Sequence, residues 1–311
     1  MEDENDSIDE QDYQLQLSRV FNTPGDDDED EWQTDEEHDG ITEHKWTCYT
    51  NTTCSNDVSI IYHLAFLAPG HGDSLWNSSR CIAEHFLHPE RKAELLGTLL
   101  LENAQNESKF QWPPKTCLEF GAGAALPSLA LLKEGAHRVV FTDRYVNEQT
   151  FDALKLSIEK NALAWDINEE VVKRRTIVAS HTWGEEIENL VNAVVAGAET
   201  VDEKGGKHVD LLIASDCIYN PTYHAPLLQS ASALIEPSTG IFIVGYSLHG
   251  NVPTADVERF FEQAEKEYGL QVIHELAIEY SEGQMGIGSV DESRGNVYLK
   301  ILACREPFHC N

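Results

Sequence analysis

The sequence lacks several features that would place it in common classes of protein. Its seven cysteines include no C-x-x-C pair, which is the ligand spacing of many structural zinc sites. No apolar run approaches the length of a membrane span, and the first residues are acidic rather than a basic segment followed by an apolar one. We therefore expect a soluble, cytoplasmic protein with reduced cysteines, no metal site and no membrane partner.

Basic residues are also scarce. The 311-residue chain has 22 Lys and Arg against 54 Asp and Glu, giving a formal net charge of −32. Such a charge disfavours direct binding to a nucleic-acid backbone and favours a basic partner. Residues 1–45 hold 18 acidic and 2 basic residues, which is half of the net charge, and few large apolar ones. We expect this stretch to be an acidic, disordered tail.

The composition changes at Trp46, and we expect a folded domain over residues 46–311. Residues 46–115 are interpreted as an N-terminal helical extension and 116–305 as the core. The apolar stretch Val58–Leu67 indicates a strand or a short buried segment. Two helices are expected next, over Ser78–Leu87 and Pro89–Ala104, because proline suits the first turn of a helix.

From Thr116 onward, short apolar runs alternate with longer helical patterns, which is typical of a parallel sheet with crossover helices. Residues 199–208 are interpreted as an exposed loop insertion, and 281–295 as a polar connection between an antiparallel pair of strands. The fold class expected is α/β: a Rossmann-like, seven-stranded, mostly parallel sheet with an antiparallel last strand and helices on both faces. The strands are expected at Thr116–Phe120, Arg138–Thr142, Thr176–Ala179, Val209–Ala214, Ile241–Gly245, Leu270–Tyr280 and Asn296–Ala303. The helices are expected at Leu126–Glu134, Asn147–Lys160, Glu185–Ala196, Pro221–Ile235 and Thr254–Tyr268.

A small-residue turn, Gly121-Ala-Gly123, follows the first core strand. Glycines there let backbone N–H groups approach a ligand closely, although such a turn alone is weak support for any ligand. The third glycine of the dinucleotide fingerprint is replaced by Ala125 and Leu126, and Glu119 precedes the turn. A carboxylate at that place would repel a pyrophosphate, whereas it suits a cationic nucleoside such as S-adenosylmethionine.

The next strand ends at Asp143, which lies 20 residues after Gly123. At this spacing an acid at the end of the second strand reaches the ribose hydroxyls of a bound nucleotide. Asp143 is therefore predicted to hold the ribose. The alternative is that Asp143 caps the following helix, and both roles are compatible.

Five further motifs stand along residues 58–303: Leu75-Trp76-Asn77-Ser78-Ser79-Arg80, Leu118-Glu119-Phe120-Gly121-Ala122-Gly123, Val139-Val140-Phe141-Thr142-Asp143, His181-Thr182-Trp183-Gly184 and Ala214-Ser215-Asp216-Cys217-Ile218-Tyr219-Asn220. Together they resemble a known family, the class I seven-strand methyltransferases, and within it the family-16 protein lysine methyltransferases. The segments Asn220-Pro221-Thr222-Tyr223-His224, Tyr246-Ser247-Leu248-His249 and Asp291-Glu292-Ser293-Arg294-Gly295-Asn296-Val297 look most like the fungal branch that methylates the N-terminus and a neighbouring lysine of translation elongation factor 1-alpha, also labelled nicotinamide N-methyltransferase-like.

The resemblance implies S-adenosylmethionine as the cofactor and a role for each matching residue. It implies that Trp76 packs at the methionine end, that Asp143 holds the ribose and that Trp183 flanks the adenine. It further implies a backbone lining from Gly121, Ala122, Gly123 and Ser215. Both tryptophans can instead be core anchors. The sequence departs from the family at Ala125, in the loop after Tyr246, and in its long acidic tail.

Asp216 and Tyr219 form the D-x-x-Y element of the family and are the predicted catalytic residues. We expect Asp216, or a backbone carbonyl beside it, to orient a neutral amine, and Tyr219 to form an aromatic wall around it. The alternative is that Asp216 caps the next helix and Tyr219 fills the mouth of the pocket.

Three kinds of function remain open at this stage. The first is a protein methyltransferase, acting as a monomer on a lysine or N-terminal amine of a basic protein, with elongation factor 1-alpha as the suspected substrate. The second is a small-molecule N-methyltransferase acting on a pyridine such as nicotinamide. The third is a catalytically idle domain that uses the fold for binding. A nicotinamide-dinucleotide oxidoreductase is disfavoured because the third glycine is missing.

Overall fold

The computed structural model describes residues 40–48, 57–65, 74–100, 110–145, 147–196, 208–248, 253–279 and 296–305. All of them belong to one compact unit, Asp35–Asn311. Three predicted segments lie outside the described residues: the tail up to residue 39, residues 199–207 of the first predicted loop and the whole of the second, 281–295. Within the described ranges, no helix has the length and apolar character needed to cross a membrane.

The centre of the fold is a seven-stranded sheet with the strand order β5-β4-β3-β6-β7-β9-β8. The five strands from β5 to β7 are mutually parallel, while β9 runs antiparallel to both of its neighbours. This confirms the predicted fold class. The strands of the sheet are β3 (Thr116–Phe120), β4 (Arg138–Asp143), β5 (Thr176–Ser180), β6 (Leu211–Ser215), β7 (Ile241–Ser247), β8 (Leu270–Glu279) and β9 (Asn296–Cys304).

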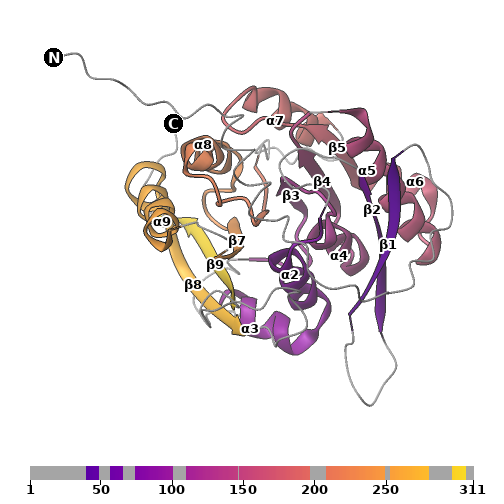
Figure 1. The fold of residues 1–311 in the computed structure, drawn as a ribbon, viewed down its shortest axis with the longest axis horizontal. Helices are drawn as coiled ribbons and strands as arrows, with labels where there is room; N and C mark the ends of the chain where they lie inside the picture. The colour runs from indigo at the N-terminus through magenta and orange to yellow at the C-terminus, as the bar shows by residue number, and fades with distance from the viewer. Residues whose placement is uncertain are drawn as a thin grey trace, which may run out of the picture. The chain divides into compact units, whose positions relative to one another are not determined.

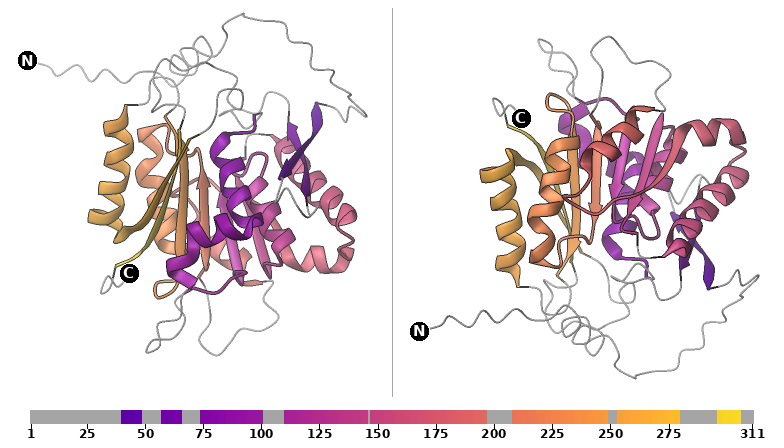
Figure 2. Two further views of the ribbon diagram at one scale, coloured as in Figure 1. Left: turned by 90° about the horizontal axis from the view of Figure 1, so that it is seen from below. Right: turned by 90° about the horizontal axis from the view of Figure 1, so that it is seen from above.

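Helices cover both faces of the sheet, as Figures 1 and 2 show. Side chains alternate between the faces, so Cys117 of β3 faces one helical layer while Leu118 faces the other. The first layer contains α2 (Asn77–Leu87), α3 (Pro89–Leu100), α4 (Leu126–Glu134), α5 (Glu148–Ala164) and α6 (Glu169–Arg175). The second contains α7 (Ile187–Ala196), the short 3-10 helix η1 (Pro221–Tyr223), α8 (His224–Leu234) and α9 (Thr254–Tyr268).

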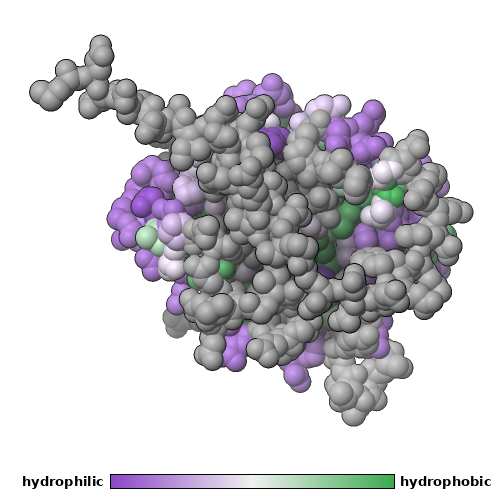
Figure 3. Space-filling model, viewed as in Figure 1, coloured by the Kyte–Doolittle hydropathy of each residue, from purple (hydrophilic) through white to green (hydrophobic). Residues whose placement is uncertain are grey.

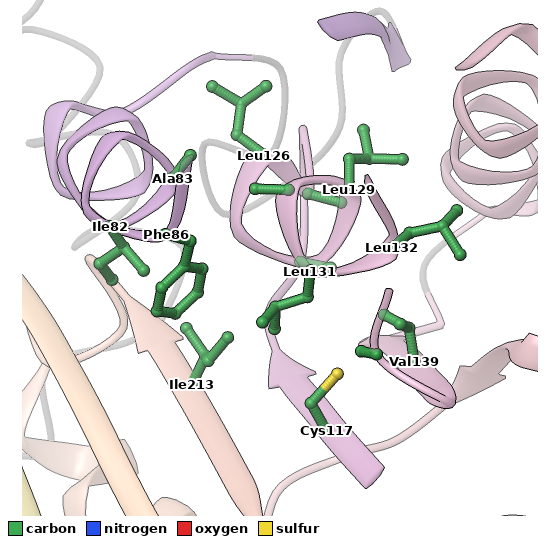
Figure 4. Packing of buried hydrophobic residues seen from close by; sticks show 14 of the residues in the cluster. Ile82, Ala83, Phe86, Cys117, Leu126, Leu129, Leu131, Leu132, Val139 and Ile213 are labelled. Carbon is green, nitrogen blue, oxygen red and sulfur yellow. The ribbon is translucent and has the colours of Figure 1, made fainter. Parts of the chain in front are cut away.

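Helices α2 and α4 pack against each other on one face of the sheet (Figure 4). Phe86 and Leu129 are fully buried there, and burying a side chain of this size stabilises a fold by roughly 1.5–3 kcal/mol. Helix α4 has a proline, Pro127, in its first turn and ends at Gly135, whose left-handed backbone lets its N–H bond to the carbonyls of Leu131 and Leu132. The turn before α4 is thus attached to a short, almost completely buried helix.

The N-terminal part of the domain differs from the predicted helical extension. It contains an antiparallel pair, β1 (Ile41–Cys48) and β2 (Val58–Ala65), which forms a separate two-stranded sheet ahead of α2. Strand β1 therefore begins inside the range predicted as tail. The strand expected near Val58 and the two helices that follow it are present.

Helix α5 holds the edge of β2 through polar side chains. The amide of Asn161 accepts the N–H of Ile61 at 2.9 Å and donates to its carbonyl, and the hydroxyl of Ser157 accepts the N–H of His63 at 2.8 Å. These bonds satisfy backbone groups that a strand edge would otherwise leave unpaired. On the face drawn in Figure 3, hydrophobic side chains show chiefly where β2 and α5 lie in Figure 1.

Candidate active site

The predicted site residues come from four strands that end at one edge of the sheet. In the register of the sheet, Phe120 of β3 pairs with Ala214 of β6, and Ser215 of β6 pairs with Gly245 of β7. The turn at Gly121 and the loop at Asp216 therefore leave the sheet side by side. Ligands of open α/β sheets bind at this carboxyl edge, where the strand order reverses.

The turn after β3 is close-packed and needs its glycines. Gly121 and Gly123 have φ angles of +58° and +48°, a region that other residues rarely adopt. A Cβ on Gly121 would lie 3.1 Å from Sγ of Cys217 and 3.4 Å from Cζ2 of Trp183. The N–H of Ala122 donates to the carbonyl of Thr142 at 2.9 Å, which ties the turn to β4. The turn is therefore fixed, with a backbone that no side chain of its own covers at the two glycines.

Asp143 stands at the end of β4 beside this turn. Its Oδ2 accepts the N–H of Gly123 at 3.0 Å, and its Oδ1 accepts the N–H of Arg144 at 2.7 Å. Burial raises the pKa of the Asp143 carboxyl, and these two bonds work against that rise. The alternative capping role is taken by another residue, since the side chain of Asn147 caps α5 by accepting the N–H of Thr150.

Glu119 lies beneath the turn rather than at its mouth. Its side chain is fully buried, and its Oε2 accepts the N–H of Ser128 in the first turn of α4 at 3.1 Å. Its Oε1 has no hydrogen-bond partner among the described residues. Burial raises the pKa of Glu119 to about 8, and the charge of Asp143 adds to that rise. With a pKa of about 8 the carboxyl is mostly protonated and uncharged at neutral pH, so Glu119 does not place the full negative charge beside the turn that the sequence suggested.

Trp183 packs directly against the turn, because its Cζ2 lies 3.4 Å from the place that a Cβ of Gly121 would occupy. It is half-buried in the segment between β5 and α7, and its ring meets that of Tyr223 edge to face, with centroids 6.1 Å apart. Two residues earlier, the N–H of His181 donates to the carbonyl of Asp143 at 2.9 Å. Trp183 therefore lies near both Gly121 and the end of β4.

Asp216 connects the site to helix α2. Its Oδ2 accepts the hydroxyl of Ser78 at 2.5 Å and the N–H of Ser78 at 3.3 Å, while its Oδ1 accepts the N–H of Ser247 at 3.0 Å. Asp216 thus caps the first turn of α2, not the helix that follows it, which is capped by Asn220. Trp76 is the residue that immediately precedes α2, so these bonds also place Trp76 at this edge of the sheet.

The remaining predicted residues lie in the same loop, and the structure adds others. Ser215 and Tyr219 are half-buried, and the carbonyl of Ser215 accepts the thiol of Cys217 at 3.4 Å. Sequence reasoning gave no role to Cys217 or His181, although both stand inside motifs that it singled out. The sequence also indicates no role for Ser230 of α8, whose hydroxyl accepts the N–H of Gly184 and lies 2.9 Å from Nε2 of His181.

The strand order, the glycine turn after β3 and the acid at the end of β4 together define a Rossmann-like, nucleoside-binding enzyme of the seven-strand methyltransferase class. The chain belongs to the lysine methyltransferase family, whose model matches residues 61–267. This confirms the predicted family and, with it, S-adenosylmethionine as the cofactor. The glycine cradle at Gly121, which a Cβ would fill, and the buried Oε1 of Glu119, which has no partner among the described residues, fit such a nucleoside.

Curated relatives come from several fungi and carry the name protein N-terminal and lysine N-methyltransferase EFM7. The protein of Cryptococcus neoformans is 30% identical over 181 residues, which are 58% of this chain and 49% of the relative. That of Yarrowia lipolytica is 28% identical over 206 residues, 65% of this chain and 66% of the relative. That of Candida glabrata is 30% identical over 204 residues, 65% of each chain. The chain thus spans about half the length of the first relative and about two thirds of the others.

Proposed function

We propose that this protein is an S-adenosylmethionine-dependent protein N-methyltransferase that modifies a lysine, an N-terminal amine or both, in translation elongation factor 1-alpha. The observation that carries the activity is the match to relatives named protein N-terminal and lysine N-methyltransferase over the region that builds the site, while the elongation factor is the substrate that the sequence resemblance suggests. The geometry at the carboxyl edge of β3, β4 and β6 supports it, because residues from three strands and from α2 face one place.

The proposed roles follow from where each side chain stands. The backbone at Gly121 and Gly123 would lie against the cofactor, Asp143 would bind its ribose and Trp183 its adenine. When bound, S-adenosylmethionine supplies a sulfonium-linked methyl group for direct transfer to an amine. Most of the catalytic effect of such a site comes from alignment of the reacting groups and exclusion of water.

The amine has to lose its proton before it attacks, so it needs a hydrogen-bond acceptor and a pocket that tolerates a cation. The bonds from Ser78 and Ser247 hold the carboxylate of Asp216 in a fixed orientation at this edge of the sheet. A carboxylate accepts from several donors at once, so a fixed one can also orient an amine. Tyr219, three residues further along the same loop, would supply the aromatic wall. We therefore retain Asp216 and Tyr219 as the proposed catalytic residues, with Asp216 also positioning α2.

The proposed substrate is a basic protein, because the chain carries a net charge of −32 and would attract positive charge over the range of the Debye length. We further propose that the enzyme acts as a monomer in the cytoplasm, where elongation factors operate. The mass of the purified protein in solution tests the oligomeric state. Its distribution among the fractions of lysed cells tests the location.

The test of function combines purified protein, S-adenosylmethionine and recombinant elongation factor 1-alpha, with peptide mass spectrometry of the product. We expect methyl groups on the N-terminal amine and on a lysine. Asp143→Asn should lower the rate about tenfold or more, because it weakens the bond to the ribose by at least about 1.4 kcal/mol. Asp152→Asn, which changes an exposed acid of α5 that pairs with Lys155, is the matched control and should retain the activity. Transfer to nicotinamide without transfer to protein would support the small-molecule alternative instead.

A further inference from the structure

The segment that carries Trp183 is anchored on helix α8 by one buried hydroxyl group. Ser230 is fully buried, and its Oγ accepts the N–H of Gly184 at 2.8 Å. The same Oγ lies 2.9 Å from Nε2 of His181. The two residues that Ser230 binds thus stand on either side of Trp183, two positions before it and one after.

The chemistry of these groups lets both bonds form at once. A hydroxyl has one hydrogen to donate and two lone pairs to accept with. Burial lowers the pKa of His181, so its ring is neutral near pH 7 and carries one acceptor nitrogen. Ser230 can therefore accept the backbone N–H of Gly184 and donate its own hydrogen to Nε2 of His181. A serine in a helix usually bonds within its own helix, whereas this one bonds across to the neighbouring segment.

Packing around Gly184 leaves no room for the segment to shift toward α8. Gly184 has a φ of +79°, and a Cβ there would lie 3.2 Å from Cα of Pro226 and 3.3 Å from Oε1 of Gln229. At the other end, the N–H of His181 is held by the carbonyl of Asp143. The segment is thus fixed to α8 and β4 together, and Trp183 is left pointing at Gly121, 3.4 Å from the place of its absent Cβ.

We propose that Ser230 is a positioning residue for nucleoside binding, which holds the His181–Gly184 segment so that Trp183 stands in a preformed position against Gly121. The inference rests on the proposed function, because it takes the adenosyl group of the cofactor as the ligand. Ser230 itself lies behind the segment and touches no ligand. Because the segment is already held in place, Trp183 loses less conformational entropy when the nucleoside binds, and the affinity is higher.

A second buried serine provides a matched control. Ser157 of α5 accepts the backbone N–H of His63 at 2.8 Å, and its Oγ lies 3.3 Å from Nδ1 of the same histidine. Ser157→Ala and Ser230→Ala therefore both remove a buried hydroxyl that accepts a backbone N–H and lies beside a histidine ring, although Ser157 also donates to the carbonyl of Ala153 in its own helix at 2.8 Å. They differ in place, because Ser157 supports β2 and Ser230 supports the segment that carries Trp183.

The test is titration calorimetry of the full chain with S-adenosylhomocysteine, which needs no methyl acceptor. We expect Ser230→Ala to weaken binding about fivefold or more and Ser157→Ala to change it less than about twofold, at a temperature where circular dichroism shows all three proteins folded. Equal affinities of wild type and Ser230→Ala would overturn the inference and leave the proposed function intact. No binding by wild type would overturn the proposed function and the inference with it.

A second measurement reports on Trp183 itself and keeps the test open if Ser230→Ala is too unstable. Acrylamide quenches the fluorescence of accessible tryptophans, and the part of the quenching that is lost in Trp183→Phe is assigned to Trp183. We expect the quenching of Trp183 to increase in ligand-free Ser230→Cys, because a thiol is similar in size to the hydroxyl but forms weaker hydrogen bonds. The Ser157→Cys variant should leave it unchanged. Quenching of Trp183 that is the same in both variants and in wild type would contradict the proposed anchoring.

Discussion

The hydroxyl of Ser78 donates to Oδ2 of Asp216 at 2.5 Å and so joins the start of helix α2 to the loop after β6, across 138 positions of the sequence. Oδ1 of the same carboxylate accepts the N–H of Ser247 at the end of β7. Asp216 itself has a φ of +52°, a conformation that aspartate tolerates better than most residues. One carboxylate thus joins three segments at the carboxyl edge of the sheet, with Trp76 next to them.

Replacing this carboxylate should cost stability as well as activity. In Asp216→Ala, the buried N–H groups of Ser78 and Ser247 lose their acceptor, and each unsatisfied group costs about 1–3 kcal/mol. We expect the free energy of unfolding, measured with urea, to fall by about 3 kcal/mol in total. Asp152→Ala, at an exposed position, should change it by less than about 0.5 kcal/mol. Equal stability of the two variants would show that the Asp216 bonds are not important for the fold.

Kinetics of Ser78→Ala then separate the two roles of Asp216. This variant keeps the carboxylate but releases the start of α2. If Asp216 acts through α2 and Trp76, Ser78→Ala should raise the KM for S-adenosylmethionine severalfold. If Asp216 acts only on the amine, Ser78→Ala should leave that KM unchanged while Asp216→Ala lowers kcat.

Glu119 should make the stability of the protein depend on pH. Its pKa is raised from 4.5 to about 8 in the folded protein because the carboxyl is buried. Between these two values the folded protein holds a proton that the unfolded chain has released, so stability falls as pH rises through this window. The loss between about pH 5 and pH 8 is on the order of 4 kcal/mol.

The check is urea unfolding of wild type and Glu119→Gln across that pH range. The side-chain amide of this variant cannot ionise and can still accept the N–H of Ser128, so we expect the variant to gain stability relative to wild type as pH rises. Parallel stability curves for the two proteins would mean that Glu119 is already ionised at the acidic end of the range and that the buried environment does not control its proton.

Two glycines should respond in opposite ways to alanine. Gly121→Ala places a methyl group 3.1 Å from Sγ of Cys217 at a φ of +58°, so it should destabilise the fold by at least about 1 kcal/mol and weaken nucleoside binding. Gly97→Ala is the control: it lies within α3 and its Cβ would meet nothing within 4 Å. It should stabilise the protein by about 0.5–1 kcal/mol. Thermal unfolding measures the change in stability of both variants, and calorimetry measures nucleoside binding. Unchanged stability and binding in Gly121→Ala would show that the turn is not close-packed at this position.

The sequence predicts most of the central sheet because its strands are short, apolar and separated by helical patterns. The elements that were missed have weaker signals. In β1, polar residues stand between Ile41 and Cys48, and the strand is stabilised by pairing with β2. Helix α6 has seven residues and buries only Val172, so periodicity could not show it, although Asn168 caps it.

The site residues also differ in how far the sequence predicts them. Gly121, Gly123 and Asp143 follow strand ends at fixed spacings, so their meeting can be predicted from parallel strands alone. The hydrogen bond between Ser78 and Asp216 could not be predicted in this way, because Ser78 precedes the sheet and reaches Asp216 only through the packing of α2 on β6 and β7. Ser230 is equally hidden, since nothing in a helix sequence indicates which distant segment a buried hydroxyl will bind.

The most direct test of the account is the intact mass of elongation factor 1-alpha after incubation with this protein and S-adenosylmethionine, with Asp143→Asn as the comparison. With wild type, the account predicts that the intact mass increases by whole methyl groups and that digestion places these groups on the N-terminal peptide and on a lysine. With Asp143→Asn, the same increase should be far slower. An unchanged mass, in a preparation shown by calorimetry to bind S-adenosylhomocysteine, would contradict the proposed substrate.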